Sequence, residues 1–391
     1  MSCLLAGGRV FTGDRIIDGH GVLIDGDRIA AVLPVADAPP GVRLRHVPAD
    51  TLLVPGFLDV QVNGAGGVLF NDTPTAEAAL AIAAVVRRTG TTGVLPTFMT
   101  DERAKLRDAC EAAVVACARP AGGVLGLHLE GPFLSPERPG VHSPPWMRKP
   151  DPGDIELLVS IAKRWTGGRG RLLLTLAPER VDDRDIARLA AAGITLAAGH
   201  TAATLERTRE AVAAGVRGFT HLFNAMPPVI NRQPGPVAAA FIEPDAWCSI
   251  IADGVHVHPA LLRLLVQVKP PGKVLLVTDA MPPSGTDATS FTLFGRTIRR
   301  HDGRLVTEDG TLAGADIDMA ASVRNCVQLL GLPLEDSLRM ASLYPAAYLG
   351  LDDQLGRAAP GYRADLALLK PDFSVLATWV GGDEQWYGDA R

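Results

Sequence analysis

The chain has 391 residues, a length that suits either several domains or one large α/β barrel with an attached unit. Apolar residues make up 47% of the chain, which is ample for a buried core, and the charged fraction of 21% is ordinary. The net charge of −5 gives no electrostatic reason to expect nucleic acid or an anionic membrane as a partner.

The N-terminus and the cysteines indicate the compartment. The opening MSCLLAGGRVFTGDR lacks the charged start and apolar stretch of a signal peptide, and no apolar run approaches the ~20 residues needed to span a bilayer. The five cysteines are scattered and form no CxxC pair, which favours free thiols in a reducing compartment. We therefore expect a cytoplasmic protein.

Short β-rich runs with turn signals fill the first part of the chain. Gly-Asp steps at Gly13-Asp14 and Gly26-Asp27 suit tight turns between strands. The C-terminal run RADLALLKPDFSVLATWVGG has the same character. Because chain termini often lie close together, we expect residues 1–54 and 351–391 to form one small β-sandwich domain.

Between these ends, candidate strands alternate with candidate helices. Runs such as TLERTREAVAAG and HPALLRLLVQV are typical of helices, and two further helical segments cover 316–331 and 335–350. The alternation predicts a (β/α)8 TIM-like barrel over 55–350 in preference to a doubly wound sheet. The eight candidate strands are 56–62, 93–98, 124–130, 171–177, 194–200, 216–222, 248–253 and 273–280.

Polar residues gather at the ends of these strands. Glu130, His200, His221 and Asp279 all lie at or just past the carboxyl end of a candidate strand. A lone histidine is more often a core or surface residue than a ligand. In a (β/α)8 barrel, however, active sites are built on this rim, so four such residues point to one shared site.

These residue types indicate metal-assisted hydrolysis. Glu130 with two neutral imidazoles makes a three-ligand set that leaves a position for water, and a divalent metal lowers the pKa of that water toward ~7. Asp279, at the end of LLVTD, could take the proton of the water and pass it to a leaving amine. The combination predicts cleavage of a C–N bond.

At these positions the sequence resembles the N-acetylglucosamine-6-phosphate deacetylases of the amidohydrolase superfamily. The matching motifs occur in family order and, with the flanking β segments, cover nearly the whole chain. HLEGP and THLFNAM together are far more specific than a strand-end histidine. The motifs are PGFLDVQVNGAGG, LGLHLEGPF, PGVHSPPWMRKP, AAGHTAAT, THLFNAMPP, IIADGVHVHP, LVTDAMPP and LAG at 312–314.

The resemblance implies one divalent ion per active site, bound by Glu130, His200 and His221. Many members of the superfamily carry HxH after the first strand, and here Gln61 and Asn63 occupy those places. Amides are poor substitutes for imidazole at zinc or iron, although they can hydrogen-bond water or substrate. We expect zinc, with iron or another divalent ion as alternatives.

The resemblance also implies roles for loop residues. Asp279 matches the catalytic aspartate, and His142 matches a histidine that touches the substrate and polarises the acetyl carbonyl. Arg232 is implied to reach the phosphate from a neighbouring subunit of a homodimer or a higher homo-oligomer. The expected substrate-binding residues are Gln61, Asn63, Val141, His142, Asn224, Ala225, Arg232, His256, Leu312, Ala313 and Gly314.

Four residues fall outside this assignment. His128 shares a strand face with Glu130 but matches no ligand, so we interpret it as structural, and His258 has no assigned role. Where the family has small hydroxyl residues after Gly314, this chain has Ala315-Asp316. Asp316 either N-caps the following helix or places a negative charge near the sugar.

The expected reaction is hydrolysis of N-acetyl-D-glucosamine 6-phosphate to D-glucosamine 6-phosphate and acetate, by metal-bound hydroxide with Asp279 as general base and acid. The nearest alternatives are N-acetylgalactosamine 6-phosphate, the C4 epimer, and another amidohydrolase substrate. An alternative of a different class is a barrel without catalytic activity that is used for binding. The expected partner is therefore a small phosphosugar, with neither nucleic acid nor membrane.

Overall fold

The computed structural model describes residues 2–165 and 170–388, and its largest unit is a barrel of parallel strands. Its eight strands are β8 (Phe57–Val62), β11 (Thr91–Met99), β12 (Gly126–Glu130), β13 (Arg171–Leu176), β14 (Thr195–Ala198), β15 (Gly218–Phe219), β16 (Trp247–Ile250) and β17 (Val274–Leu276). They lie in the order β17-β16-β15-β14-β13-β12-β11-β8, so each strand neighbours the next one along the chain. All eight predicted strands are confirmed.

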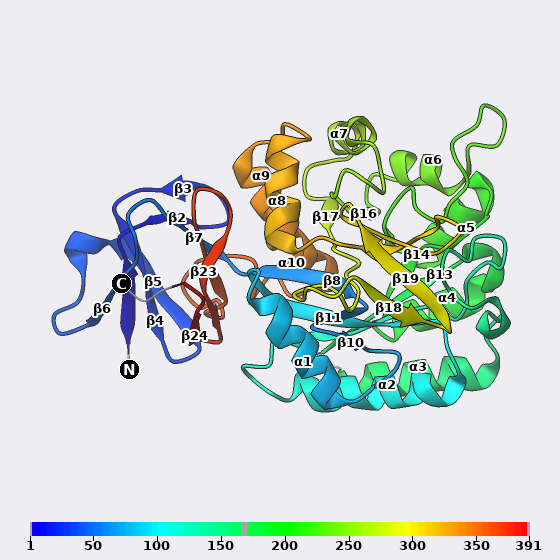
Figure 1. The fold of residues 1–391 in the computed structure, drawn as a ribbon, viewed down its shortest axis with the longest axis horizontal. Coiled ribbons are helices and arrows are strands. Elements are labelled where there is room, and N and C mark those ends of the chain that lie inside the picture. The colour runs from blue at the N-terminus through cyan, green and yellow to red at the C-terminus, as the bar shows by residue number, and fades with distance from the viewer. Residues whose placement is uncertain (1, 166–169, 389–391) are drawn as a thin grey trace.

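The sheet closes where its first strand meets its last. Val62, at the end of β8, forms a parallel bridge with Ala280, just after β17. The backbone N–H groups of Asn63 and Gly64 donate to the Ala280 carbonyl oxygen at 2.9 and 3.1 Å. Closure brings the carboxyl ends of all eight strands to one rim, and the predicted (β/α)8 barrel is confirmed (Figure 1).

Helices surround the barrel. The helix α5 begins after Thr204, whose hydroxyl accepts the N–H of Arg207, and ends at Gly215, as the sequence predicts. The predicted helical segment 335–350 is two helices, because the backbone at Ser342 leaves the helical region. The helices are α1 (Ala76–Arg87), α2 (Arg103–Cys117), α3 (Pro152–Trp165), α4 (Asp183–Ala191), α5 (Leu205–Ala214), α6 (Gly235–Ile242), α7 (Pro259–Val268), α8 (Met319–Gln328), α9 (Leu334–Ala341), α10 (Leu343–Leu349) and the 3-10 helices η1 (Val35–Asp37), η2 (Pro144–Trp146) and η3 (Pro178–Arg180). Among the described residues, no helix is long and apolar enough to cross a bilayer.

Both ends of the chain build a second unit beside the barrel (Figure 1). Strand β7, from the N-terminal part, pairs antiparallel with β22 from the C-terminal part, so the predicted pairing of the two ends is confirmed. Two sheets face each other, in the orders β5-β4-β1-β6 and β24-β23-β22-β7-β2-β3. Their strands are β1 (Cys3–Ala6), β2 (Arg9–Phe11), β3 (Ile16–Ile17), β4 (His20–Asp25), β5 (Arg28–Pro34), β6 (Arg43–His46), β7 (Leu52–Pro55), β22 (Leu366–Leu369), β23 (Val375–Val380) and β24 (Asp383–Trp386).

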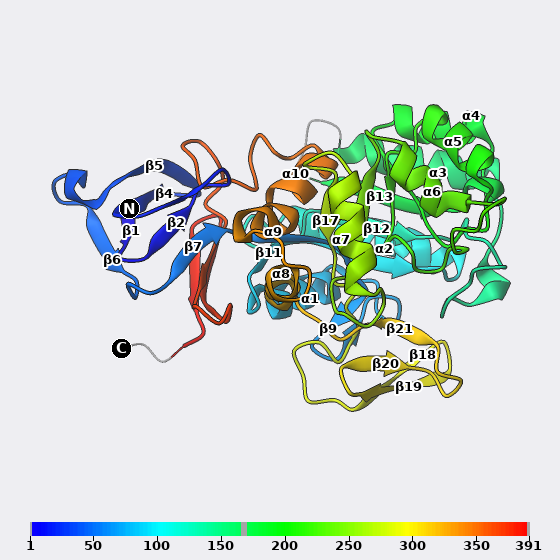
Figure 2. The ribbon, with the colours of Figure 1, turned by 90° about the horizontal axis from the view of Figure 1, so that it is seen from above.

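A further small sheet, absent from the sequence prediction, stands beside the barrel rim (Figure 2). Its strands are β18 (Ser290–Leu293), β19 (Arg296–His301), β20 (Arg304–Val306) and β21 (Leu312–Ala315), and the short pair β9 (Gly64–Ala65) and β10 (Val68–Leu69) lies nearby. Leu293, Ile298 and Leu305 pack with Val141 of the rim, and the guanidinium of Arg296 donates to the Val141 carbonyl. Strands β18, β19 and β20 each bury few apolar residues among exposed polar ones, so their sequence pattern is weak.

Candidate metal centre and active site

The four polar residues predicted at the strand ends meet at the barrel rim. Glu130 is the last residue of β12, and His200, His221 and Asp279 follow β14, β15 and β17 within three residues. The backbone of the latter three is left-handed, with φ of 47°, 31° and 53°. Non-glycine residues rarely hold this conformation, which costs about 1–3 kcal/mol and concentrates at functional sites.

Three potential ligand atoms form a small triangle at this rim. His221 Nε2 lies 2.9 Å from Glu130 Oε1 and 3.2 Å from His200 Nε2, and His200 Nε2 lies 3.3 Å from Glu130 Oε1. A tetrahedral ion at about 2.1 Å from each ligand separates its ligand atoms by about 3.4 Å. The spacing and chemistry of these donors therefore fit a divalent metal ion.

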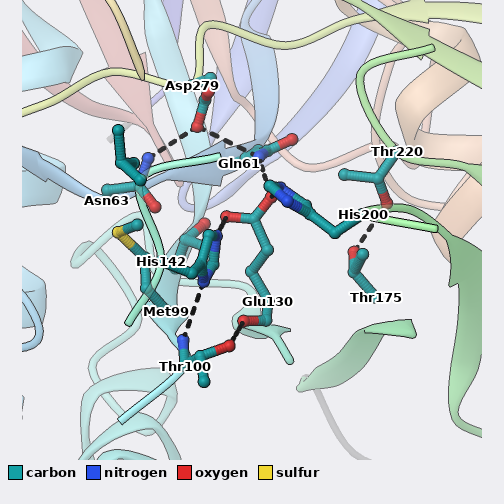
Figure 3. A network of polar contacts seen from close by, with 12 residues as sticks. Gln61, Asn63, Met99, Thr100, Glu130, His142, Thr175, His200, Thr220 and Asp279 are labelled. Atoms are coloured by element: carbon teal, nitrogen blue, oxygen red, sulfur yellow. Dashed lines mark hydrogen bonds and ion pairs between the residues drawn. The ribbon is translucent and has the colours of Figure 1, made fainter. Parts of the chain in front are cut away.

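A further imidazole, that of His142, lies close to the second carboxylate oxygen of Glu130 (Figure 3). Its Nε2 is 3.4 Å from Glu130 Oε2, and the ligand atoms of Glu130, His142 and His200 all lie within 4.8 Å of one another. The rim therefore offers four candidate ligands, one more than the predicted set of Glu130, His200 and His221.

The Nδ1 atoms of His200 and His142 differ in their hydrogen-bond partners. His200 Nδ1 lies 3.0 Å from the carbonyl oxygen of Arg138, so this nitrogen donates and leaves the Nε2 lone pair for a metal. His142 Nδ1 accepts the N–H of Thr100 at 3.3 Å, so a neutral ring carries its proton on Nε2. Hydrogen bonding thus favours His200 as a ligand and His142 as a donor.

The amide pair at the end of β8 joins the two acids of the site (Figure 3). Gln61 Nε2 donates to Glu130 Oε1 at 3.0 Å and to Asp279 Oδ1 at 3.1 Å. Asn63 Nδ2 donates to the same Asp279 oxygen at 2.7 Å. Both amides are buried, and they place N–H donors between carboxylates that would otherwise repel each other.

The two acids have opposite pKa shifts. Burial opposes the charge of Glu130, but hydrogen bonds with His142, His200 and His221 hold the pKa of Glu130 well below its usual value. Burial and, next, the charge of Glu130 raise the pKa of Asp279 to about 6. Glu130 is therefore ionised, as a metal ligand must be, whereas Asp279 is poised to exchange a proton near neutral pH.

A second polar network lies deeper in the barrel, which we call the inner polar layer: Thr97, His128, Thr175 and Thr220. His128 Nδ1 lies 3.1 Å from the Thr97 hydroxyl, its Nε2 lies 2.8 Å from the Thr175 hydroxyl, and Thr175 is 2.6 Å from Thr220. Burial lowers the pKa of His128 to about 4. Both ring nitrogens are satisfied, which supports the structural interpretation of this residue.

A cavity of about 340 Å³ opens onto the candidate metal ligands. Gln61, Asn63 and Ala313 are buried, and these three are not among the described residues that line the cavity. Arg232 is exposed and lines a separate pocket of about 410 Å³. The predicted residues that line the cavity are Glu130, Val141, His142, His200, His221, Asn224, Ala225, His256, Asp279, Leu312 and Gly314.

Sequence reasoning missed part of the cavity wall. The additional lining residues are mainly apolar or glycine, and such residues carry no chemical signal of their own. Two of them directly precede predicted residues, which is the one hint that the sequence contained. The missed residues are Met99, Gly140, Ile251, Met281, Gly310 and Thr311.

Two residues of uncertain role now have partners. Asp316 pairs with Arg300 at 2.7 Å, and the N-cap of α8 is instead Asp318, whose side chain accepts the N–H of Ala321. The hypothesis that Asp316 caps this helix is wrong, because the helix begins three residues later at Met319 and a cap directly precedes its helix. His258 N-caps α7.

Comparison with known proteins agrees with this geometry. Residues 52–384 match the amidohydrolase family, and residues 4–48 match the NagA composite domain. The N-acetylgalactosamine-6-phosphate deacetylase of Shewanella sp. (strain ANA-3) is 39% identical over 85% of this chain and 82% of its own length. The N-acetylglucosamine-6-phosphate deacetylase of Haemophilus influenzae is 33% identical over 95% of this chain and 96% of its own.

Solved structures give the same result. The N-acetylglucosamine-6-phosphate deacetylase of Pasteurella multocida is 34% identical, with a TM-score of 0.94 over 99% of this chain and 100% of that one. The enzyme of Mycobacterium smegmatis is 35% identical, with a TM-score of 0.88 over 98% and 99%. The chain therefore belongs to the amidohydrolase family, in the group that contains the N-acetylglucosamine-6-phosphate deacetylases.

Proposed function

We propose that this protein hydrolyses N-acetyl-D-glucosamine 6-phosphate to D-glucosamine 6-phosphate and acetate with the help of a divalent metal. The observation that carries the proposal is the triangle of Glu130, His200 and His221, which lines a cavity together with Asp279. A mutant of the Mycobacterium smegmatis relative has been solved in complex with this phosphosugar, which supports the choice of substrate.

In this proposal Glu130, His200 and His221 hold one ion per site, with zinc preferred and iron or another divalent ion as alternatives. When bound, such an ion polarises the amide carbonyl and lowers the pKa of a water molecule. The amide pair supports a count of one, because Gln61 and Asn63 both donate N–H to the acids and amides are poor ligands for zinc or iron.

Asp279 moves the proton and His142 stabilises the carbonyl oxygen. The amide pair occupies Asp279 Oδ1, so Oδ2 takes the proton of the attacking water and later gives it to the leaving amine. Burial and the charge of His200 lower the pKa of His142 to about 4, so this ring is neutral at working pH. Its Nε2–H then donates to the oxygen on which charge develops.

The phosphosugar contacts come from loops around the cavity. Asn224, Ala225 and His256 would hold the phosphate and sugar, and the backbone around 312–314 would close over the ring. Arg232 would reach the phosphate from a neighbouring subunit, because it lies outside the cavity of its own chain. The adjacent Val229 and Ile230 are 56% and 50% exposed, and such apolar exposure supports a homodimer or a higher homo-oligomer.

The decisive experiment measures acetate release by the metal-reconstituted protein from the two epimeric sugar phosphates. We expect faster turnover of the gluco substrate. Preference for N-acetylgalactosamine 6-phosphate would establish the alternative that the 39% identical Shewanella relative favours. Activity on neither epimer would leave another amidohydrolase substrate, or a binding role without catalysis, and would overturn the proposal.

A mixing experiment tests the proposed subunit contact. Arg232→Ala and Asp279→Asn should each have little activity alone, yet mixed dimers would contain one site with both residues intact. Recovery of activity after subunit exchange is the expected result. Absence of recovery despite proven exchange would place each site within one chain.

The remaining proposals concern organisation and location. We propose that residues 55–350 form the metal-dependent barrel and that 1–54 and 351–391 form the small β domain. A cytoplasmic location also stays a prediction, and fractionation of the native cell would test it.

A further inference from the structure

Asp253 and His256 form a buried pair beside the cavity, and neither is one of the proposed metal ligands. Both lie in the loop that follows β16, and their side chains are only 6% and 7% exposed. His256 Nδ1 lies 2.6 Å from Asp253 Oδ2, and His256 lines the cavity. Asp253 is not among the described residues that line the cavity, so any effect on a bound molecule must pass through His256.

The loop itself fixes the carboxylate of Asp253. Its Oδ1 accepts the backbone N–H groups of Val255 and His256 at 2.8 and 2.9 Å. The loop is anchored in turn by α8, because Asn325 Nδ2 donates to the Ala252 carbonyl oxygen at 2.9 Å. With Oδ1 occupied in this way, Oδ2 is the oxygen that meets the imidazole.

We propose that Asp253 is a positioning residue, which fixes the orientation and tautomer of His256 so that Nε2 faces an oxygen of the phosphosugar. A carboxylate only accepts hydrogen bonds, so the proton of the shared contact belongs to His256 Nδ1. Nε2 is then the ring nitrogen available to the cavity. The inference rests on the proposed function, which places His256 against the substrate.

His258 supplies an internal reference for this assignment. It lies two residues beyond His256, and its Nδ1 accepts the N–H of Ala260 at 3.2 Å. Because Nδ1 accepts there, a neutral His258 ring carries its proton on Nε2. The same loop therefore contains two histidines with opposite tautomers.

Nitrogen NMR of the 15N-histidine-labelled protein tests the tautomer without any need for activity. We expect a proton on Nδ1 of His256 and, in the neutral ring, on Nε2 of His258, with signals assigned by His256→Gln and His258→Gln. Asp253→Asn should move the His256 proton to Nε2, because the new side-chain N–H would face Nδ1. A wild-type His256 without a proton on Nδ1 overturns the proposal, and this outcome needs no folded variant.

Kinetics test the consequence for substrate. Asp253→Asn should raise KM for the phosphosugar by about 10–100-fold, the range observed when a residue that orients a metal-binding histidine is removed, while kcat changes much less. In a His256→Ala background the same change should have no further effect on KM. Additive losses in the double variant, or an unchanged KM in the single one, overturn the proposal.

Two controls separate this inference from the proposed function. Asp365→Asn changes a matched buried carboxylate in the terminal β domain, which accepts the N–H of Gly381 and pairs with Arg363, and it should leave KM unchanged. If Asp253→Asn raises KM equally for phosphorylated and unphosphorylated sugar, His256 contacts a hydroxyl and its phosphate assignment fails, while the role of Asp253 stands. If wild-type protein releases no acetate, the NMR result decides alone.

Discussion

The barrel rim and the inner polar layer contain similar polar residues, but they differ in whether the hydrogen-bonding atoms have partners. In the inner polar layer both nitrogens of His128 have hydrogen-bond partners. The rim lies only two residues further along β12, at Glu130. There the amide oxygens of Gln61 and Asn63 and the Nδ1 of His221 are buried without a partner among the described residues. A closed network stabilises the fold, whereas an open one keeps polar atoms for a ligand.

Burial alone does not distinguish the two sets. His128 is 0% exposed, and Glu130 and His221 are 2% and 3% exposed. The backbone does distinguish them, because His128 lies within a regular strand whereas His221 has positive φ. The rim therefore combines polar atoms that lack hydrogen-bond partners with a strained backbone. If this combination marks function, changes at the rim should affect metal binding and turnover, and changes in the inner polar layer should affect stability.

The largest expected effect is on the metal. His200→Ala removes one of three proposed ligands, so metal content should fall from about one ion per site toward zero and kcat/KM by more than about 100-fold. Metal analysis and acetate release measure both quantities, with His258→Ala as the control. Full metal content in His200→Ala would remove this residue from the ligand set, and two ions per wild-type site would contradict the single-ion proposal.

The next effect is on proton transfer. Asp279→Asn keeps the shape of the side chain but removes its basic oxygen, so turnover should fall by about 10²–10⁴-fold. Metal content should stay near that of the wild type, since Asp279 is not one of the proposed ligands. Turnover close to that of the wild type would require another base.

A substitution in the inner polar layer should lower the stability of the fold and leave metal binding intact. His128→Ala leaves a cavity and removes one hydrogen-bond partner from each of the hydroxyls of Thr97 and Thr175, which should lower the free energy of unfolding by about 2–4 kcal/mol. Urea denaturation measures this loss, and metal analysis of the folded fraction should still find the ion. Loss of metal without loss of stability would show that His128 serves metal binding and not the fold.

The last effect concerns pH and appears only below neutral pH. The pKa of folded His128 is lowered to about 4 from an ordinary value near 6.5, so the unfolded chain binds the extra proton between these values. Its contribution to stability is therefore complete above pH ~6.5 and is lost as the pH falls toward 4. The pH dependence of unfolding free energy in His128→Gln, subtracted from that of the wild type, should isolate this slope. No difference between the two curves would contradict the burial of a neutral ring.

Local sequence patterns predicted much of the fold. Apolar runs of strand length that alternate with capped helices predicted all eight barrel strands, because burial imposes a period that is visible within one element. The strand-end positions of Glu130, His200 and His221 then placed the site, since a barrel collects these ends at one rim. The β18–β21 sheet was missed, because its first three strands bury few residues each.

Only the tertiary structure decided which atoms meet. The bridge from Gln61 to Asp279 joins residues 218 positions apart, and it exists because barrel closure places β8 beside β17. The roles of His128 and His142 likewise depend on partners from other elements, Thr175 in β13 and Thr100 just after β11. A sequence specifies which residues turn inward along one element, but the hydrogen-bond partner of each nitrogen is set by elements that only the folded chain brings together.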